Sequence, residues 1–298
     1  MAGTKEIKTH IDSVQETQKI TNAMYLIAAT KLRRARQELD NTRPYFQALQ
    51  GEIRRIFRAT NEVDCRYFYP ENPADSGGGV YGCLLITADK GLAGSYNQNA
   101  IREAARLLEQ HPNTKLFVVG EYGRRVLTQR GIPIEHSFLY TAQNPTMARA
   151  REISTLLLSR YDRGELQKIF VVYTDMERGM TFQAHSTRLL PFHRSHFDTP
   201  QAEQPAAPFE FLPSPMAVLK NMIHSYVSGF IYSALIDSFC CEQNARMVAM
   251  DSANQNAEKL LGELSLQYNR VRQSAITQEI TEVSAGARAQ RRNRGKER

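Results

Sequence analysis

Residues 215–287 read PMAVLKNMIHSYVSGFIYSALIDSFCCEQNARMVAMDSANQNAEKLLGELSLQYNRVRQSAITQEITEVSAGA, and this stretch decides the fold. Ser214-Pro215 is a favourable helix start, and no proline follows it. As one helix, the stretch would be roughly 110 Å long at about 1.5 Å per residue. Steps of four and three residues alternate along a coiled-coil seam, which comprises Leu219, Met222, Tyr226, Gly229, Ser233, Ile236, Cys240, Gln243, Met247, Met250, Asn254, Ala257, Leu261, Leu264, Tyr268, Val271, Ala275 and Gln278.

A helix of this length needs a second helix along its side. Residues 4–58 carry the comparable pattern, which predicts an antiparallel coiled coil of the two chain ends. Pro44 is expected to kink or interrupt the N-terminal helix. If that helix ended near Arg43, the long helix would be unpaired from about Asn254, and amide exchange would be fast beyond Gly262. The N-terminal seam comprises Ile7, Ile11, Val14, Gln18, Thr21, Tyr25, Ala28, Leu32, Ala35 and Leu39, and a second apolar stretch includes Phe46, Leu49, Ile53, Ile56 and Phe57.

The middle of the chain has a different pattern, in which short apolar runs alternate with helical segments. The runs are Val80 to Thr87, Leu116 to Gly120 and Ile169 to Thr174, and the helical segments are Asn97 to Gln110, Glu121 to Gln129 and Pro145 to Tyr161. Alternating strands and helices predict a small Rossmann-like α/β domain with a mostly parallel sheet. Asn144-Pro145 is the expected start of the third helix, with Asn as the cap.

These patterns divide the chain into four predicted segments. They are a coiled-coil helix at 1–60, an α/β domain at 75–195, a coiled-coil helix at 214–287 and a basic tail at 288–298. The fold class is therefore α/β with long helices: an antiparallel coiled coil of N- and C-terminal helices plus the small α/β domain.

Charge is concentrated at the two ends of the chain, which has a net charge of +7. Residues 1–60 hold 11 Lys and Arg against six Asp and Glu, and residues 288–298 hold six against one. An acidic partner is expected to meet these ends. The sequence shows neither an apolar run of about 18 residues nor an apolar leader, so we expect a cytosolic protein.

Candidate chemical sites are few. Asp89 to Gly94 follows a predicted strand, but its GxxG spacing is weak and favours a tight turn over nucleotide binding. His193 and His196 lack a third metal ligand at matching spacing, and the four cysteines lack zinc spacing, so we expect no metal and read the cysteines as reduced packing residues. The sequence offers no set of nucleophile, base and orienting group, which predicts no catalytic residues and no cofactor. The tail could attract phosphate backbones, but no aromatic or groove-reading element accompanies it, so no nucleic-acid partner is expected.

Three groups of motifs are spread over nearly the whole chain. The N-terminal group is Lys5-Glu6-Ile7, Thr17 to Met24 and Ala28 to Ala35, and the middle group is Thr87 to Gly94 with Tyr96-Asn97. The C-terminal group is Ala245 to Met250, Ala253-Asn254, Asn256-Ala257, Tyr268 to Gln273 and Ile276 to Ile280. In this order the three groups resemble the gamma subunit of F-type ATP synthases. Asn22, Tyr25-Leu26 and Ala93 depart from the family pattern, as does the basic tail beyond Ala287.

The resemblance implies a rotor shaft that couples ion flow to ATP synthesis or hydrolysis at sites on other subunits. Expected partners are the alpha and beta subunits, the epsilon subunit and the membrane ring of c subunits, at the cytoplasmic face of a bacterial cell membrane. The implied subunit-contact residues are a basic band (Lys31, Arg33, Arg34 and Arg36), an upper contact (Arg272, Gln273, Thr277 and Glu279) and a foot near Phe211. On its own the band usually indicates a solvated helix face, and only the resemblance makes a subunit contact about equally favoured. The alternatives are a coiled-coil scaffold unrelated to energy conversion and a small α/β enzyme with helical arms.

Overall fold

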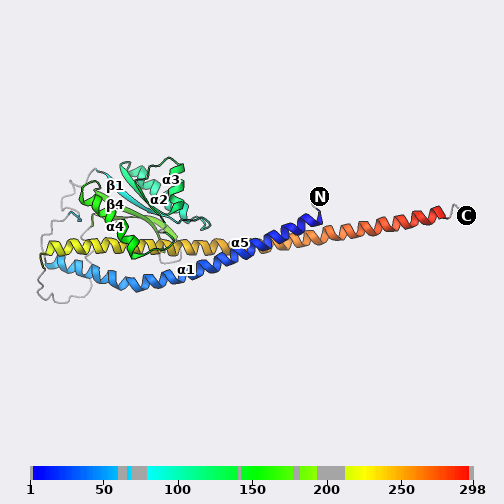
Figure 1. Cartoon of the computed structure of the whole chain (residues 1–298), viewed down its shortest axis with the longest axis horizontal. Helices are drawn as coiled ribbons and strands as arrows, with labels where there is room; N and C mark the ends of the chain where they lie inside the picture. The colour runs from blue at the N-terminus through cyan, green and yellow to red at the C-terminus, as the bar shows by residue number, and fades with distance from the viewer. Residues whose placement is uncertain are drawn as a thin grey trace. The chain divides into compact units, whose positions relative to one another are not determined.

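The structure, a computed structural model, describes residues 3–59, 66–68, 79–139, 142–176, 182–192 and 212–294 (Figure 1). The chain forms two compact units, one made of residues 1–27 and 248–298 and the other of residues 28–247. Two long helices, α1 (Thr4–Ala59) and α5 (Pro215–Arg294), run through both units. This division does not test the four predicted segments, which stay a prediction.

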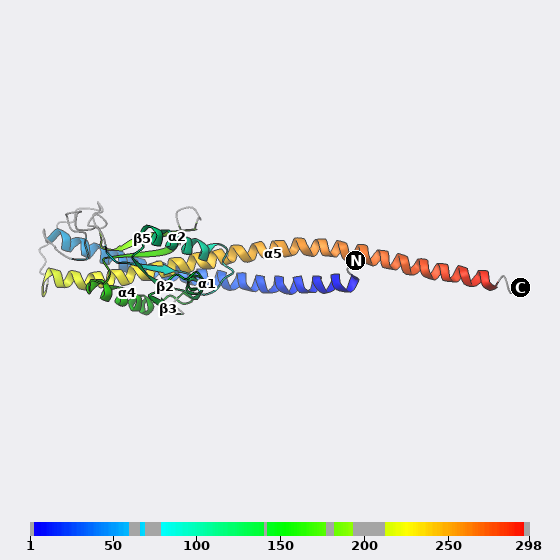
Figure 2. The ribbon, with the colours of Figure 1, turned by 90° about the horizontal axis from the view of Figure 1, so that it is seen from above.

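In the unit made of residues 1–27 and 248–298, α1 and α5 pair as an antiparallel coiled coil. Ile7 and Leu264 are buried on its seam, and the Thr21 hydroxyl donates a hydrogen bond to Asn254 Oδ1. Within this unit, Figures 1 and 2 show α5 continuing past the amino end of α1. The predicted seam ends at Val271, because every residue from 272 to 288 is exposed. The expectation that pairing stops near Asn254 is therefore wrong.

Pairing reaches that far because α1 does not end near Arg43 but continues to Ala59. Pro44 lies inside α1 and does not interrupt it. The turns beyond Pro44 are held on α5: the Gln50 side-chain amide donates to the Tyr226 hydroxyl at 3.1 Å, and Phe46 packs so closely on Gly229 that a Cβ there would lie 1.7 Å from its ring. These tertiary contacts outweigh the hydrogen bond that proline removes from the helix.

The other unit contains a five-stranded sheet with the order β3-β2-β1-β4-β5. β1 (Tyr81–Ile86), β2 (Thr114–Val119), β3 (His136–Phe138) and β4 (Lys168–Met176) are parallel, and β5 (Phe182–Leu190) is antiparallel to β4. The predicted mostly parallel sheet is confirmed. Residues 136–138 and 182–190 were not predicted as strands, because neither segment forms a continuous apolar run.

Both faces of the sheet are covered by helices. Cys83 and Leu85 of β1 point into a core with α2 (Tyr96–Gln110) and α3 (Glu121–Gln129). Leu84 and Ile86, on the opposite face, join a larger core with α4 (Met147–Asp162), α5 and α1. The alternation along β1 follows from the two-residue period of a strand.

The structure confirms the predicted start of α5 but not the predicted cap of α4. α5 begins at Pro215 as predicted, and the Ser214 hydroxyl accepts a hydrogen bond from the Ala217 amide at 3.2 Å. The predicted cap of α4 is wrong, since Thr146 rather than Asn144 caps the helix and accepts from the Arg149 amide at 3.3 Å. Among the described residues, no helix combines the length and the apolar character needed to cross a bilayer.

Candidate functional site

The basic band (Lys31, Arg33, Arg34 and Arg36) lies on the part of α1 that belongs to residues 28–247, and all four side chains are exposed. The buried seam residues Leu32 and Ala35 alternate with them, which places the cations on both flanks of the helix. Arg34 is 3.4 Å from Glu38 in an exposed pair. Such a pair contributes little stability, so the band remains available to other charges.

Each flank of the band borders a shallow hollow. Lys31 and Arg34 rim a hollow of about 190 Å³ with an apolar floor of Ala35, Ile236 and Phe239. On the other flank, Arg33 and Arg36 rim a hollow of about 340 Å³ that also includes Asp40 and Met247. The band therefore combines positive charge with small apolar depressions, an arrangement that suits a peptide carrying both acidic and apolar side chains.

The upper-contact residues lie on the exposed end of α5, in the unit made of residues 1–27 and 248–298. Arg272 and Glu279 share one helix face at a spacing of seven, while Gln273 and Thr277 occupy the neighbouring face at a spacing of four. The Thr277 hydroxyl donates to the Gln273 carbonyl at 2.9 Å, and Arg272 is exposed. Phe211, His193 and His196 lie outside the described residues.

A Rossmann-like sheet usually binds ligands at the carboxyl ends of its strands, and α5 fills that crevice here. The loop after β1 forms the predicted turn, with positive φ at Leu92 (62°) and Gly94 (54°). Ala93 and Tyr96 from this region pack against Cys241 of α5 in one buried cluster. Burial raises the pKa of Tyr96 well above its usual range, and the nearby Glu242 carboxylate adds to this.

Glu242 and Arg246, which sequence reasoning missed, form a buried ion pair at this crevice. Their atoms Oε1 and Nη1 lie 2.6 Å apart, and the side chains are 8% and 12% exposed. Burial raises the pKa of Glu242, and the Arg246 guanidinium offsets only part of this effect. The signal was present in the sequence: opposite charges four residues apart directly follow an apolar run on α5.

The three described cysteines are packing residues, in line with expectation. Cys83, Cys240 and Cys241 are buried and free. Desolvation raises the pKa of Cys83 to about 12 and that of Cys240 to about 11, so both thiols stay protonated near neutral pH. Cys65 lies outside the described residues. Within the described residues, no cluster of three or more His, Cys, Asp and Glu side chains could hold a metal ion.

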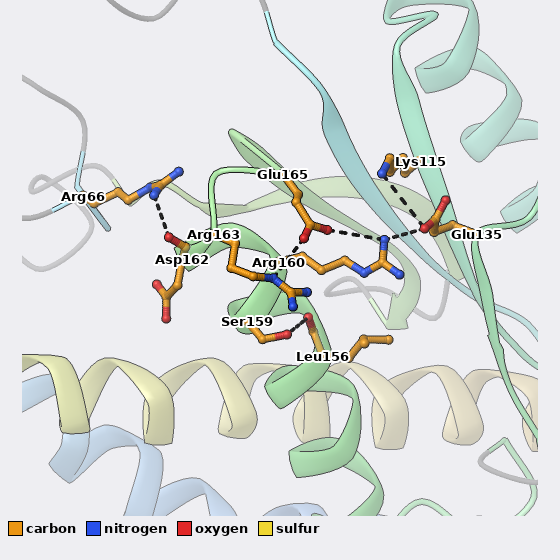
Figure 3. Close-up of polar contacts among 9 residues, drawn as sticks. All are labelled: Arg66, Lys115, Glu135, Leu156, Ser159, Arg160, Asp162, Arg163 and Glu165. Carbon is orange, nitrogen blue, oxygen red and sulfur yellow. Dashed lines mark hydrogen bonds and ion pairs between the residues drawn. The ribbon is translucent and has the colours of Figure 1, made fainter.

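The amino-terminal edge of the sheet carries a separate network of charges (Figure 3). Arg160 of α4 bonds Glu135 and lies 3.7 Å from Glu165, and its guanidinium carbon is 5.6 Å from the centre of the Phe117 ring. The hydrogen bond from Arg160 lowers the pKa of Glu135, which also lies 4.0 Å from Lys115. These charges neutralise one another and fix α4 to the strands, so the network is structural.

Comparisons with known proteins agree with this architecture. The family model described as ATP synthase matches residues 3–290. The chain is 40% identical over 294 residues to the ATP synthase gamma chain of Caldanaerobacter subterraneus subsp. tengcongensis, covering 96% of this chain and 99% of the relative. It is 34% identical over 295 residues to the ATP synthase gamma chain of Acetivibrio thermocellus, with coverages of 97% and 99%.

A solved structure shares the fold. It is a chain from the central stalk and c-ring of the Tetrahymena thermophila mitochondrial ATP synthase, with a TM-score of 0.55 at 23% identity, covering 78% of this chain and 99% of that one. The chain thus belongs to the ATP synthase family and, within it, to the gamma chains.

Proposed function

We propose that the chain couples ion flow to ATP chemistry through mechanical contacts, with no active site of its own. The observation that carries this proposal is the filled crevice. Cys241 and the Glu242–Arg246 pair occupy the place where a Rossmann-like fold would receive a nucleotide. The α/β domain therefore serves as a fixed attachment on α5, and ATP is handled by the alpha and beta subunits.

A rotor changes nucleotide affinity only by contacting the catalytic subunits unequally, since equal contact shifts no equilibrium. Each difference of about 1.4 kcal/mol in contact energy changes an affinity about tenfold. The exposed basic band and the accessible upper contact are the surfaces we assign to these contacts. Rotation would bring them to each catalytic subunit in turn and so make the sites alternate.

The basic band suits an acidic loop of a beta subunit, because its four cations flank two hollows that also contain apolar side chains. Arg272 and Gln273 would contact a second loop of a catalytic subunit, supported by Thr277 and Glu279. The foot near Phe211 and the α/β domain would meet the c ring and the epsilon subunit. This assembly places the chain peripherally, at the cytoplasmic face of a bacterial cell membrane.

Reconstitution tests the proposal. The tagged chain, mixed with alpha and beta subunits, should be recovered in a complex that hydrolyses ATP in a rotor-dependent manner, and membranes rebuilt with the complex should pump ions. Alanine at Lys31, Arg33, Arg34 and Arg36 together should weaken coupling of pumping to hydrolysis. Failure of the wild-type chain to enter such a complex would refute the proposed coupling role.

A further inference from the structure

The Glu242–Arg246 pair also connects α5 to the loop after β1. Arg246 points one nitrogen at Glu242 and the other at the loop after β1, where Nη2 donates to the Gly91 carbonyl at 3.1 Å. One guanidinium thus joins two parts of the chain that are far apart in sequence. Its planar fork makes both contacts at once, which a lysine ammonium on a flexible stem cannot reproduce.

The loop that Arg246 holds is bound to both helices that follow it. The Asn97 side chain of α2 accepts from the Ala88 amide at 2.9 Å and donates to the Lys90 carbonyl at 3.3 Å. Asp89 accepts from the Glu121 amide at the start of α3 at 2.9 Å. The loop is therefore the point where β1, α2 and α3 meet, and Arg246 attaches that junction to α5.

The attachment lies at the far end of a series of contacts between α5 and the α/β domain. His224 lies 4.0 Å from Asp162 at the amino edge of the sheet, and Ser228 bonds Ser154 at 2.7 Å. Near the carboxyl edge, the Ser238 hydroxyl accepts from the Thr174 amide at 3.2 Å. Arg246 provides the last of these contacts, and it is the one that carries a buried charge.

We infer that Glu242 and Arg246 lock the carboxyl edge of the sheet onto α5, so that the α/β domain and the helix turn as one body under load. This inference rests on the proposed function. Removing one member of a buried pair leaves an uncompensated charge, which must be hydrated by opening the loop. Glu242 and Arg246 are therefore positioning residues, and their loss should loosen the domain.

Hydrogen exchange on the purified full-length chain tests the lock directly. Arg246→Ala should speed exchange at least about tenfold at the amides of Ala88, Tyr96 and Tyr122, which bond within or onto the loop. Arg246→Lys should show most of this effect, and Glu242→Gln should show it too. Arg124→Ala is the matched control, because Arg124 forms an exposed pair with Glu121 beside the same loop. Wild-type exchange in Arg246→Ala, or faster exchange spread evenly over all strands, would overturn the lock.

The functional part is tested in reconstituted membranes by measuring ions pumped per ATP hydrolysed. Arg246→Ala should lower this ratio at least twofold while hydrolysis continues, and Arg124→Ala should leave it unchanged. Faster loop exchange with an unchanged ratio would overturn the role in coupling. A wild-type complex that neither assembles nor pumps would refute the proposed function, whereas the exchange measurement on the isolated chain would still decide the lock.

Discussion

Arg272 is one of the exposed residues that we assign to a contact with another subunit. It is exposed on α5 just beyond Val271, the last seam residue that is partly buried. An arginine in this position can fork onto a carboxylate or carbonyl group. Loss of a hydrogen bond to a charged group costs about 1.5–3 kcal/mol, or roughly tenfold or more in a rate that depends on it.

Arg272→Ala should therefore slow steady-state ATP turnover of the reconstituted complex by about tenfold, leaving the helix intact because alanine is the better helix former. Arg272→Lys should restore only part of the rate if the contact is bidentate. Arg270→Ala, on a different helix face, is the control and should matter less. Equal rates for wild type and Arg272→Ala would remove Arg272 from the coupling mechanism.

Glu242 is a second single residue with a testable effect, because its contribution to the free energy of unfolding depends on pH. Its pKa is raised in the folded chain because burial penalises the carboxylate more than Arg246 favours it. A raised pKa in the folded state means that the contribution is fully present below the unfolded pKa of about 4.3 and is lost as the pH rises through the folded value. The unfolding free energy of wild type minus that of Glu242→Gln should fall over this window and then level off. Urea titrations across pH 4–8 measure it, and a difference that rises with pH would contradict the assignment.

At the scale of the helices, the close packing of α1 on α5 depends on Gly229. A Cβ there would lie within 1.7–2.6 Å of three Phe46 ring atoms, whereas one at Gly262 would meet no atom within 4 Å. Gly229→Ala should therefore destabilise the chain by about 1–3 kcal/mol through overpacking, and Phe46→Leu should relieve most of this loss. Gly262→Ala should stabilise it by up to about 1 kcal/mol through helix propensity. Urea unfolding compares the variants, and equal effects at the two glycines would refute this account.

The end of α5 supports a second prediction at this scale. In the isolated chain, amide exchange should be slow over residues 248–271, where the seam is paired, and fast over 272–288, where every residue is exposed. Assembly with the alpha and beta subunits should slow exchange in the second range. Amide exchange measured by mass spectrometry in both states checks this. Identical protection of residues 272–288 before and after assembly would rule out their contact with the alpha and beta subunits.

At the scale of the molecule, the filled crevice predicts that the purified chain neither hydrolyses ATP nor binds it tightly. Ala93, Tyr96 and Cys241 occupy the space between the loop after β1 and α5. Calorimetry with the full-length chain should give no heat of ATP binding at micromolar concentrations. Micromolar affinity, retained by a variant with Cys241→Phe, would place a nucleotide site elsewhere on the chain.

Much of this architecture was predictable because it follows from the local spacing of apolar residues in the sequence. The four-three spacing from Leu219 to Val271 corresponds to seam positions that are buried or partly buried, and the apolar runs beginning at Val80, Leu116 and Ile169 correspond to β1, β2 and β4. The basic band was visible because its charges are adjacent in sequence. Burying an apolar stripe on a partner is favourable wherever the stripe occurs, so the pattern alone specifies the element.

Tertiary structure decided the features that depend on residues far apart in the chain. α1 continues through Pro44 because Phe46 and Gln50 find partners on α5. The hydrogen bond between Arg246 and the Gly91 carbonyl joins residues 155 positions apart, so no local sequence pattern predicts it. The sequence by itself therefore determined the two helices, the sheet and the family, whereas folding alone decided the length of the pairing and the attachment of the domain, because those depend on contacts whose partners only the folded chain brings together.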